Sequence, residues 1–313
     1  MKDMSTATEL VQTSRVKKLL KIGHTKTCSC PENHINCLTP KEWVKGQVAI
    51  WEFAYEKRDV RDKNIHPAVF PVGLPKKCIE LFTHKGELVL DPFAGIGTTL
   101  IAASDTGRNA VGFDIKKEYL DYAKKRLSQT KIGGFSKDSA QQLLINDDAR
   151  NIPEYFEENT IALVVTSPPY ANMLNRKRRN KSIRAGDRDN EHFGKIQQYS
   201  NDSRDLGTLP SKMFAKEIAG IYSGILPFLR PRAHSIININ DPWVDEVKYG
   251  KREPLHAYII EEMQNVGYEL RNVLVWDKRN LVNNVGIFGW PNNFIKLGTT
   301  FEYILDFWKP PQL

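Results

Sequence analysis

The chain has 313 residues, of which 41% are hydrophobic and 26% are charged, so it is long enough to bury a substantial core. This composition excludes an intrinsically disordered or collagen-like chain. Lys and Arg number 45 against 37 Asp and Glu, and the formal net charge of +8 permits a polyanionic partner without requiring one.

We expect neither a membrane span nor a signal peptide in this sequence. The sequence has no window that approaches the roughly 18 consecutive apolar residues of a membrane span. Residues 1–13 lack the apolar centre of a signal peptide. The four cysteines, three of which lie between Cys28 and Cys37, are too few and too clustered for a disulfide framework. We therefore expect a cytoplasmic protein with reduced thiols.

Residues 1–64 are polar, Lys-rich and weakly periodic, and they are predicted to form a separate N-terminal extension. This extension holds a group of residues of the types that bind metals: His24, Cys28, Cys30, His34 and Cys37. Cys-x-Cys followed by a cysteine seven positions later is not a standard zinc spacing. Reduced, unligated thiols are therefore favoured over a small zinc site at Cys28, Cys30 and Cys37, and no metal is predicted.

From His66 onward, apolar runs alternate with amphipathic stretches, as strands alternate with helices. Buried parallel strands are predicted at 87–91, 110–115, 143–146, 161–165, 234–239 and 270–276. Helices are predicted at 74–82, 98–106, 116–129, 210–229 and 255–266. A last strand at 301–307 follows no helix of useful length and need not be parallel to the others. The predicted fold class is α/β, with a doubly wound sheet of six parallel strands and one reversed strand. This domain spans residues 65–313, with inserts at 171–206 and 280–300.

A glycine-rich turn, Asp91-Pro-Phe-Ala-Gly95-Ile-Gly97-Thr98-Thr99, lies between a predicted strand and a predicted helix. Open α/β sheets bind ligands at this position, and glycine lets a ligand approach the backbone, although a tight turn alone also needs glycine. The turn is neither the full dinucleotide fingerprint nor a phosphate-binding loop. Asp114 ends the next strand, 19 residues beyond Gly95. It could hold two ribose hydroxyls or simply cap the following helix.

The segment Thr166-Ser-Pro-Pro-Tyr170 directly follows the predicted strand at 161–165. Two consecutive prolines fix the backbone and remove two N–H donors, so nearby carbonyls can face a cavity. The Ser167 hydroxyl and a proline carbonyl could accept the hydrogens of an amine, while the Tyr170 ring stacks on the planar ring that carries this amine. A rigid turn or a WW-type ligand is the alternative, which the position at a strand end disfavours.

Together these segments resemble the amino-methyltransferases of DNA, a family that uses S-adenosyl-L-methionine (SAM) and modifies cytosine N4 or adenine N6. The resemblance extends from about Asn64 to Lys309. It covers an upstream cofactor segment, His66-Pro-Ala-Val-Phe-Pro71, and a closing antiparallel strand, Phe301-Glu-Tyr-Ile-Leu-Asp-Phe-Trp-Lys309. Asp148 resembles the acid that meets the adenine ring, although its neighbour Asp147 leaves the register open.

The resemblance implies the Rossmann-like fold of SAM-dependent methyltransferases. It implies the catalytic residues Ser167, Pro168, Pro169 and Tyr170. The cofactor-binding residues that it implies are His66, Pro67, Phe70, Asp91, Pro92, Phe93, Ala94, Gly95, Gly97, Thr98, Asp114 and Asp148.

The implied activity is site-specific transfer of a methyl group from SAM to the exocyclic amine of a flipped base in double-stranded DNA. Serine at position 167 favours cytosine N4, because the adenine enzymes of this family more often carry Asp or Asn there. Adenine N6 is the first alternative, followed by guanine N2 in RNA, a protein glutamine, or a catalytically silent nucleic-acid binder. Methylation of cytosine carbon-5 is excluded, because it needs a cysteine nucleophile and no cysteine follows Cys78.

A run of basic residues follows the catalytic motif. We expect it to bind DNA phosphates, although a solvated loop is the alternative. Its members are Arg176, Lys177, Arg178, Arg179, Lys181 and Arg184. The N-terminal extension could also contact DNA. We expect a monomer by default. The resemblance implies a cytoplasmic, nucleoid-associated protein of prokaryote or phage-like type that belongs to a restriction–modification system. Nothing in the sequence identifies a partner endonuclease.

Overall fold

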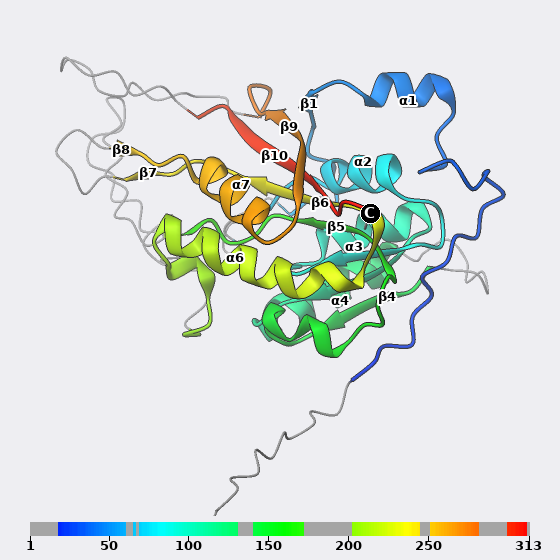
Figure 1. Ribbon diagram of the computed structural model, residues 1–313, viewed down its shortest axis with the longest axis horizontal. Coiled ribbons are helices and arrows are strands. Elements are labelled where there is room, and N and C mark those ends of the chain that lie inside the picture. The colour runs from blue at the N-terminus through cyan, green and yellow to red at the C-terminus, as the bar shows by residue number, and fades with distance from the viewer. Residues whose placement is uncertain are drawn as a thin grey trace, which may run out of the picture.

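The computed structural model describes residues 18–60, 65–66, 69–130, 140–171, 202–244, 251–281 and 299–311. In this part of the chain, helices cover both faces of an eight-stranded sheet (Figure 1). The strands of the sheet are β1 (Ile50–Glu52), β2 (Leu88–Asp91), β3 (Asn109–Phe113), β4 (Gln142–Ile145), β5 (Ile161–Thr166), β6 (Leu229–Ile239), β9 (Glu269–Asp277) and β10 (Phe301–Trp308). The helices are α1 (Pro40–Gly46), α2 (Gly73–Phe82), α3 (Thr98–Thr106), α4 (Lys117–Thr130), α6 (Ser211–Ile225) and α7 (Leu255–Asn265). A small antiparallel pair is formed by β7 (Trp243–Val244) and β8 (Lys251–Arg252).

The central strands are buried on both faces and separate two hydrophobic cores. Leu88 and Leu90 of β2 face the core that includes α6 and α7, whereas Val89 between them faces the core that includes α2 and α3. Because side chains alternate along a strand, a strand covered on both sides must be apolar throughout. This is why β2, β3 and β5 were recognisable as short apolar runs.

The strand order is β1-β9-β10-β6-β5-β2-β3-β4, in which β10 is antiparallel to both β6 and β9. The predicted class, a doubly wound α/β sheet with one reversed strand, is confirmed. From β2 the chain proceeds through β3 to β4 in one direction, and then returns to place β5 on the other side of β2. The sheet order therefore reverses between β2 and β5, and this is where such sheets open a crevice for ligands.

The predicted count of seven strands was wrong, because the N-terminal segment adds an eighth. Strand β1 runs parallel to β9, with Trp51 opposite Trp276. The strand has only three residues, and only Trp51 among them is buried. A three-residue strand with one buried side chain leaves no apolar run in the sequence.

The predicted helix at 210–229 was too long, and the following strand begins earlier than predicted. Helix α6 ends at Ile225, a 3₁₀ turn spans Leu226–Phe228, and β6 starts at Leu229. Pro227 explains the end of the helix, because proline has no N–H donor and its ring collides with the preceding helical turn. The apolar pattern continues through the turn because Phe228 and Leu229 are buried.

Within the described residues, no helix is long and apolar enough to span a membrane.

Candidate active site

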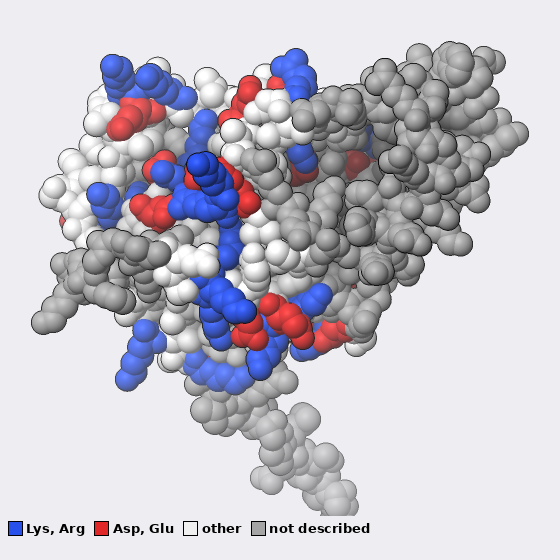
Figure 2. Space-filling view, turned by 180° about the vertical axis from the view of Figure 1, so that it is seen from behind, with Lys and Arg blue, Asp and Glu red and all other residues white. Residues whose placement is uncertain are grey.

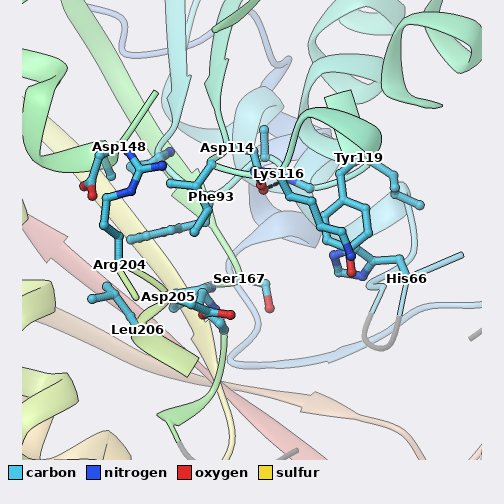
Figure 3. Close-up of a pocket in the computed structure, with 18 of the residues that line it drawn as sticks. His66, Phe93, Asp114, Lys116, Tyr119, Asp148, Ser167, Arg204, Asp205 and Leu206 are labelled. Carbon is cyan, nitrogen blue, oxygen red and sulfur yellow. Dashed lines mark hydrogen bonds between the residues drawn. The ribbon is translucent and has the colours of Figure 1, made fainter. Parts of the chain in front are cut away.

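A pocket lies where β2, β3, β4 and β5 end, at the position where the sheet order reverses (Figure 3). It is lined by His66, Val69, Phe70, Pro92, Phe93, Ala94, Gly95, Ile96, Thr98, Asp114, Ile115, Lys116, Tyr119, Asp147, Asp148, Ala149, Ser167, Pro168, Pro169, Arg204, Asp205, Leu206 and Ile221. His66 and Tyr119 lie at one end and Asp148 and Arg204 at the other, with Phe93 between them. The glycine turn and the Ser-Pro-Pro motif therefore face a single pocket.

The glycine turn after β2 has a backbone that only glycine adopts without strain. Gly95 has φ 49° and Gly97 has φ 77°, both in the left-handed region. A Cβ at Gly95 would lie 2.9 Å from His66 Nε2, and a Cβ at Gly97 would lie 2.9 Å from the Cβ of Ala123. The turn thus brings backbone against the floor of the pocket and ends at the N-terminus of α3.

The turn is also held from behind by a buried arginine of α4. Arg126 donates from Nη1 to the carbonyl of Ile96 at 2.7 Å and to Thr98 Oγ1 at 3.1 Å. Burial lowers the pKa of Arg126, against the opposing effect of Asp59. Its contacts fix the turn that forms one wall of the pocket.

Asp114 connects the glycine turn after β2 to the residues before α4. Its Oδ2 accepts the backbone N–H of Gly95 at 2.9 Å, and its Oδ1 accepts that of Lys116 at 2.8 Å. The carboxylate thus makes a short turn before α4 and also lines the pocket. Burial raises the pKa of Asp114 to about 6, against the two backbone hydrogen bonds. The structure therefore shows a structural role for Asp114 before α4, while the ribose-binding role stays a prediction that its place in the pocket permits.

Asp91 lies behind the turn and is not among the pocket-lining residues. Its Oδ1 accepts hydrogen bonds from the Thr166 hydroxyl at 2.6 Å and from the Phe93 N–H at 3.0 Å. These bonds connect the end of β2 to the end of β5. Burial raises the pKa of Asp91 to about 6, against the effect of these hydrogen bonds.

Asp147 and Asp148 both line the pocket, but their carboxylates have different partners. Asp147 accepts from the Tyr155 hydroxyl at 2.6 Å and from Asn151 at 2.8 Å. Asp148 caps the 3₁₀ turn that follows by accepting the Arg150 N–H, and its Oδ2 pairs with Nη1 of Arg150 at 2.9 Å. Neither carboxylate is excluded from the pocket, so the register that the sequence left open stays open.

The Ser-Pro-Pro-Tyr motif ends β5 and is fixed by a network from two distant strands. Tyr170 is 5% exposed, and its hydroxyl donates to Glu302 Oε2 at 2.9 Å. Asn238 of β6 donates to the Tyr170 hydroxyl at 2.8 Å and to Glu302 at 2.7 Å. Lys278 pairs with Glu302 Oε1 at 2.6 Å.

This network determines the direction of the hydrogen bond between Ser167 and Tyr170, whose oxygens are 2.9 Å apart. A tyrosine hydroxyl has a single hydrogen, and that of Tyr170 goes to Glu302. Ser167 must therefore donate its hydrogen to Tyr170. Asn238 Nδ2 also approaches the Ser167 oxygen, at a long 3.4 Å, so one lone pair of this oxygen remains to accept a hydrogen from a molecule in the pocket.

Most of the sequence-predicted residues meet at this pocket. His66, Phe70, Pro92, Phe93, Ala94, Gly95, Thr98, Asp114, Asp148, Ser167, Pro168 and Pro169 line it, whereas Asp91, Gly97 and Tyr170 do not. Pro67 lies outside the described residues, as does the basic run Arg176, Lys177, Arg178, Arg179, Lys181 and Arg184.

The sequence did not reveal several residues of the site. Lys116, Tyr119, Arg204, Asp205 and Leu206 line the pocket, and Asn238, Lys278 and Glu302 support Tyr170. The Tyr119 ring lies 4.6 Å from that of His66, and Lys116 Nζ lies 4.2 Å from the centre of the Tyr119 ring. Lys116 and Tyr119 were detectable in principle, because Lys116 directly precedes α4 and Tyr119 lies in its first turn, close to Asp114 in sequence.

The chain has relatives among known proteins. Residues 8–125, just over a third of the chain, match a family model described as DNA methylase, of the N6/N4 methyltransferase type. The type II methyltransferase M.HpaI of Haemophilus parainfluenzae is 34% identical over 98 residues, which cover 31% of each chain. M.BglI of Bacillus subtilis is 37% identical over 93 residues, 29% of this chain and 26% of the relative.

The matched segments thus span about a third or less of the length of these relatives. Among solved structures, an rRNA methylase from Streptococcus thermophilus is 15% identical, with a TM-score of 0.38, and the match covers 71% of this chain and 87% of that one. This last likeness is too low to bear on function. In sequence, the chain is a relative of the N4/N6 amino-methyltransferases of DNA, the family that its motifs resemble.

Proposed function

We propose that this protein transfers a methyl group from SAM to the exocyclic amine of a base in double-stranded DNA. The observation that carries the proposal is that Gly95 and Asp114 line the same pocket as Ser167 and Pro168. The first pair has the features of a nucleoside-binding site, and the second has the features of an amine acceptor. An enzyme that transfers a group from a nucleoside cofactor to an amine substrate must hold both molecules within one pocket.

The residues of the pocket fit SAM. The Asp114 carboxylate can accept hydrogen bonds from ribose hydroxyls, and Phe93 and Ile115 offer apolar surface to a purine ring. The left-handed Gly95 leaves no side chain between the backbone and the pocket. Asp148 supplies an acceptor for an exocyclic amino group at the end of the pocket where Arg204 lies. When bound, SAM supplies an electrophilic methyl group on its sulfonium.

The amine of cytosine or adenine is a weak nucleophile, because its lone pair is delocalised into the ring. Ser167 directs its hydrogen toward Tyr170, so its oxygen can accept a hydrogen of the amine, and the Pro168 carbonyl can accept the other. Drawing both hydrogens out of the ring plane pulls the nitrogen toward tetrahedral geometry and returns electron density to it. The surplus proton leaves to water after the transfer. No covalent bond to the protein is needed.

A base reaches such a pocket only after it leaves the helical stack, at a cost of a few kcal/mol, which contacts to phosphates offset. The basic run from Arg176 to Arg184 follows the catalytic motif directly in sequence. We propose that these residues supply phosphate contacts. Serine at position 167 makes cytosine N4 the preferred target, with adenine N6 as the alternative.

The test is tritium transfer from labelled SAM to unmethylated genomic DNA, followed by digestion to nucleosides and mass spectrometry. We expect label on cytosine N4, and loss of label with Ser167→Ala at unchanged SAM affinity. Label on adenine N6 would keep the mechanism and overturn the choice of base. Label on RNA guanine N2 or on protein glutamine alone would overturn the substrate. SAM binding without transfer to DNA, RNA or protein would identify a silent relative and overturn the proposal.

A further inference from the structure

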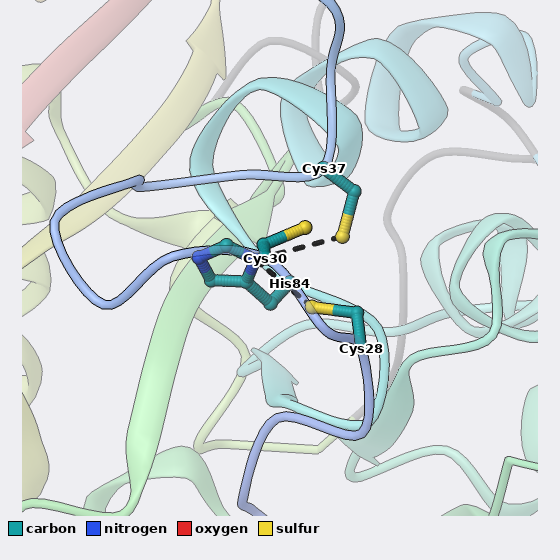
Figure 4. Close-up of side chains that lie close together, drawn as sticks. All are labelled: Cys28, Cys30, Cys37 and His84. Atoms are coloured by element: carbon teal, nitrogen blue, oxygen red, sulfur yellow. Dashed lines mark hydrogen bonds between the residues drawn. The ribbon is translucent and has the colours of Figure 1, made fainter.

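Three cysteines of the N-terminal segment and one histidine of the main domain converge at a single point, away from the pocket. Cys28 Sγ lies 3.3 Å from His84 Nδ1, and Cys37 Sγ lies 3.5 Å from the same atom. With Cys30 Sγ included, all four possible ligand atoms lie within 4.8 Å of one another. Figure 4 shows the three sulfurs and the imidazole facing a common space.

The two sulfur–nitrogen distances are close to the edges of a zinc tetrahedron, and the 4.8 Å limit on the whole set is about 1 Å wider than such an edge. With Zn–S bonds of about 2.3 Å and Zn–N bonds of about 2.0 Å, neighbouring ligand atoms lie roughly 3.5–3.8 Å apart. Free thiols have little reason to gather in this way, because S–H groups are weak hydrogen-bond donors and sulfur is a weak acceptor. A closed set of three thiolates and one imidazole is a known ligand set for structural zinc.

The orientation of His84 is a second, independent observation. Its Nε2 lies 2.8 Å from the backbone carbonyl of His34, and a carbonyl can only accept. Nε2 therefore carries the hydrogen, and the lone pair of Nδ1 points toward the sulfurs. His84 is 4% exposed, so this orientation is fixed by packing. A metal-binding histidine is usually held in this way by a backbone carbonyl on its other nitrogen.

The local charge also suits this ligand set. Three thiolates around a divalent ion leave a net charge of −1. Arg108 is 3% exposed and donates to the carbonyl of Thr83, directly before His84, at 2.7 Å. Its guanidinium interacts electrostatically with Cys37 and Cys28, and also with Glu80 and Glu87. A buried cation is therefore in place to balance the charge of the complex.

The N-terminal segment has few other means of attachment at this point. Among residues 18–46, only Asn36 is buried, and no residue of α1 is buried. The segment reaches the end of α2 and the connection after it through three hydrogen bonds: from Asn36 Nδ2 to the Leu81 carbonyl at 2.7 Å, from the Thr27 N–H to the Lys85 carbonyl at 2.8 Å, and from His84 to the His34 carbonyl. Half-buried Leu20, Ile22, Leu38 and Trp43 pack against the cores of the main domain, but the segment has no core of its own. Such segments commonly depend on a metal or a disulfide for their order.

We propose that Cys28, Cys30, Cys37 and His84 bind one structural zinc ion that fastens the N-terminal segment to the α2–β2 connection. The role is structural because four protein ligands complete a tetrahedron and leave no position for a substrate. This replaces the sequence-based preference for free thiols. The spacing of the cysteines could not reveal the site, since its fourth ligand lies 47 residues beyond Cys37.

The full chain, produced without a histidine tag and purified under reducing conditions without chelator, tests the proposal by elemental mass spectrometry. We expect one zinc ion per chain. Cys30→Ser and His84→Gln should lose the zinc, whereas His34→Ala should retain it, because only the backbone carbonyl of His34 takes part. Full zinc occupancy in His84→Gln would overturn the ligand assignment, and absence of zinc from the unmodified chain would overturn the site.

A second measurement uses the unmodified chain and does not depend on the folding of variants. After removal of zinc, added Co²⁺ should give the visible absorption of a tetrahedral complex together with a thiolate-to-cobalt charge-transfer band. The thiols of Cys28, Cys30 and Cys37 should react with a thiol reagent in the zinc-free protein and become protected from it when zinc is restored. An octahedral cobalt spectrum, or a disulfide among Cys28, Cys30 and Cys37 in the protein as isolated, would overturn the proposal. These readouts are independent of methyl transfer, so they stand or fall separately from the proposed function.

Discussion

At the scale of single residues, the proposed function depends most on Asp114. Its carboxylate is the acceptor that we assign to the ribose, and it already fixes Gly95 and Lys116. A hydrogen bond to a charged acceptor contributes about 1.5–3 kcal/mol, so Asp114→Asn should raise the Kd for SAM roughly 10- to 100-fold in calorimetry. Asp121→Asn is the matched control, because Asp121 lies on α4 with its side chain 51% exposed. Equal, small effects of both changes would return Asp114 to a purely structural role.

The same carboxylate predicts a dependence on pH. Burial raises the pKa of Asp114 to about 6, so below this pH the free protein holds a proton that bound ribose hydroxyls would displace. The Kd for SAM should therefore be nearly constant above pH 7 and rise by up to about tenfold per pH unit as the pH falls below 6. Asp91, whose pKa burial also raises to about 6, does not line the pocket, so we expect bound SAM to leave its protonation unchanged. Asp114→Asn should reduce the rise of the SAM Kd at low pH. If the Kd of this variant depended on pH as in the unmodified protein, another group would be responsible for the dependence.

Tyr170 has two separable roles, one for its aromatic ring and one for its hydroxyl. The stacking of a flipped base on its ring stays a prediction, since the ring is 5% exposed in the structure and a base must first uncover it. Its hydroxyl, in contrast, accepts the hydrogen of Ser167 and donates to Glu302. Tyr170→Phe keeps the ring and removes the hydroxyl, so kcat should fall roughly tenfold, the value of one hydrogen bond.

The comparison with Tyr170→Ala separates these roles. This change also removes the ring, so it should reduce kcat further and raise the KM for DNA, while SAM affinity is spared in both variants. Steady-state assays with labelled SAM and varied DNA concentration give kcat and KM for each variant. If Tyr170→Phe were as active as the unmodified protein, the hydroxyl network would have no part in orienting Ser167.

At the scale of elements, β1 makes the N-terminal segment part of the main sheet. Trp51 is 2% exposed, packs edge-on against Phe53 and donates from its indole to the Val48 carbonyl at 2.7 Å. Trp51→Ala should lower the free energy of unfolding by about 3–5 kcal/mol, the usual cost of removing a buried aromatic ring. Ile50→Ala on the same strand is the control, because Ile50 is 66% exposed. Denaturant unfolding measures both, and similar losses would mean that β1 packs less tightly than the structure has it.

How far the sequence predicts these elements depends on what each residue contacts. The central strands and helices were predicted to within a few residues, because burial on both faces imposes apolar runs and Gly107 marks the end of α3. The beginning of β6 was missed because only Leu229 is buried among its first four residues, Leu-Arg-Pro-Arg, so they form no apolar run.

The residues of the candidate site were likewise predictable only where they lie close together in the sequence. Residues in one continuous motif, such as Ser167, were predicted because their order in the chain is their order in space. Asn238 and Glu302 were missed, since β6 and β10 bring them to Tyr170 from 68 and 132 residues away. No local pattern encodes such a contact. His84 was missed for the same reason.

At the scale of the whole molecule, the charge of the protein bears on its proposed partner. The formal net charge is +8, yet Lys and Arg are interspersed with Asp and Glu on the face shown in Figure 2. The described surface in that view therefore has no large region of a single sign. The basic run from Arg176 to Arg184 lies outside the described residues, and we expect it to carry much of the phosphate binding.

This expectation predicts a steep dependence of DNA binding on salt. Each phosphate that the protein neutralises should contribute about −0.9 to the slope of the logarithm of the binding constant against the logarithm of salt concentration. Changing Arg176, Lys177, Arg178 and Arg179 together to Gln should therefore reduce the slope by up to about 3.6, measured by fluorescence anisotropy with duplex DNA. The control removes the same charge from exposed lysines outside the N-terminal extension, namely Lys124, Lys125, Lys212 and Lys216. Counterion release counts only the charges that contact the phosphates, so the control variant should keep its slope. Equal losses of slope in both variants would mean that net charge, and not the basic run, governs DNA binding.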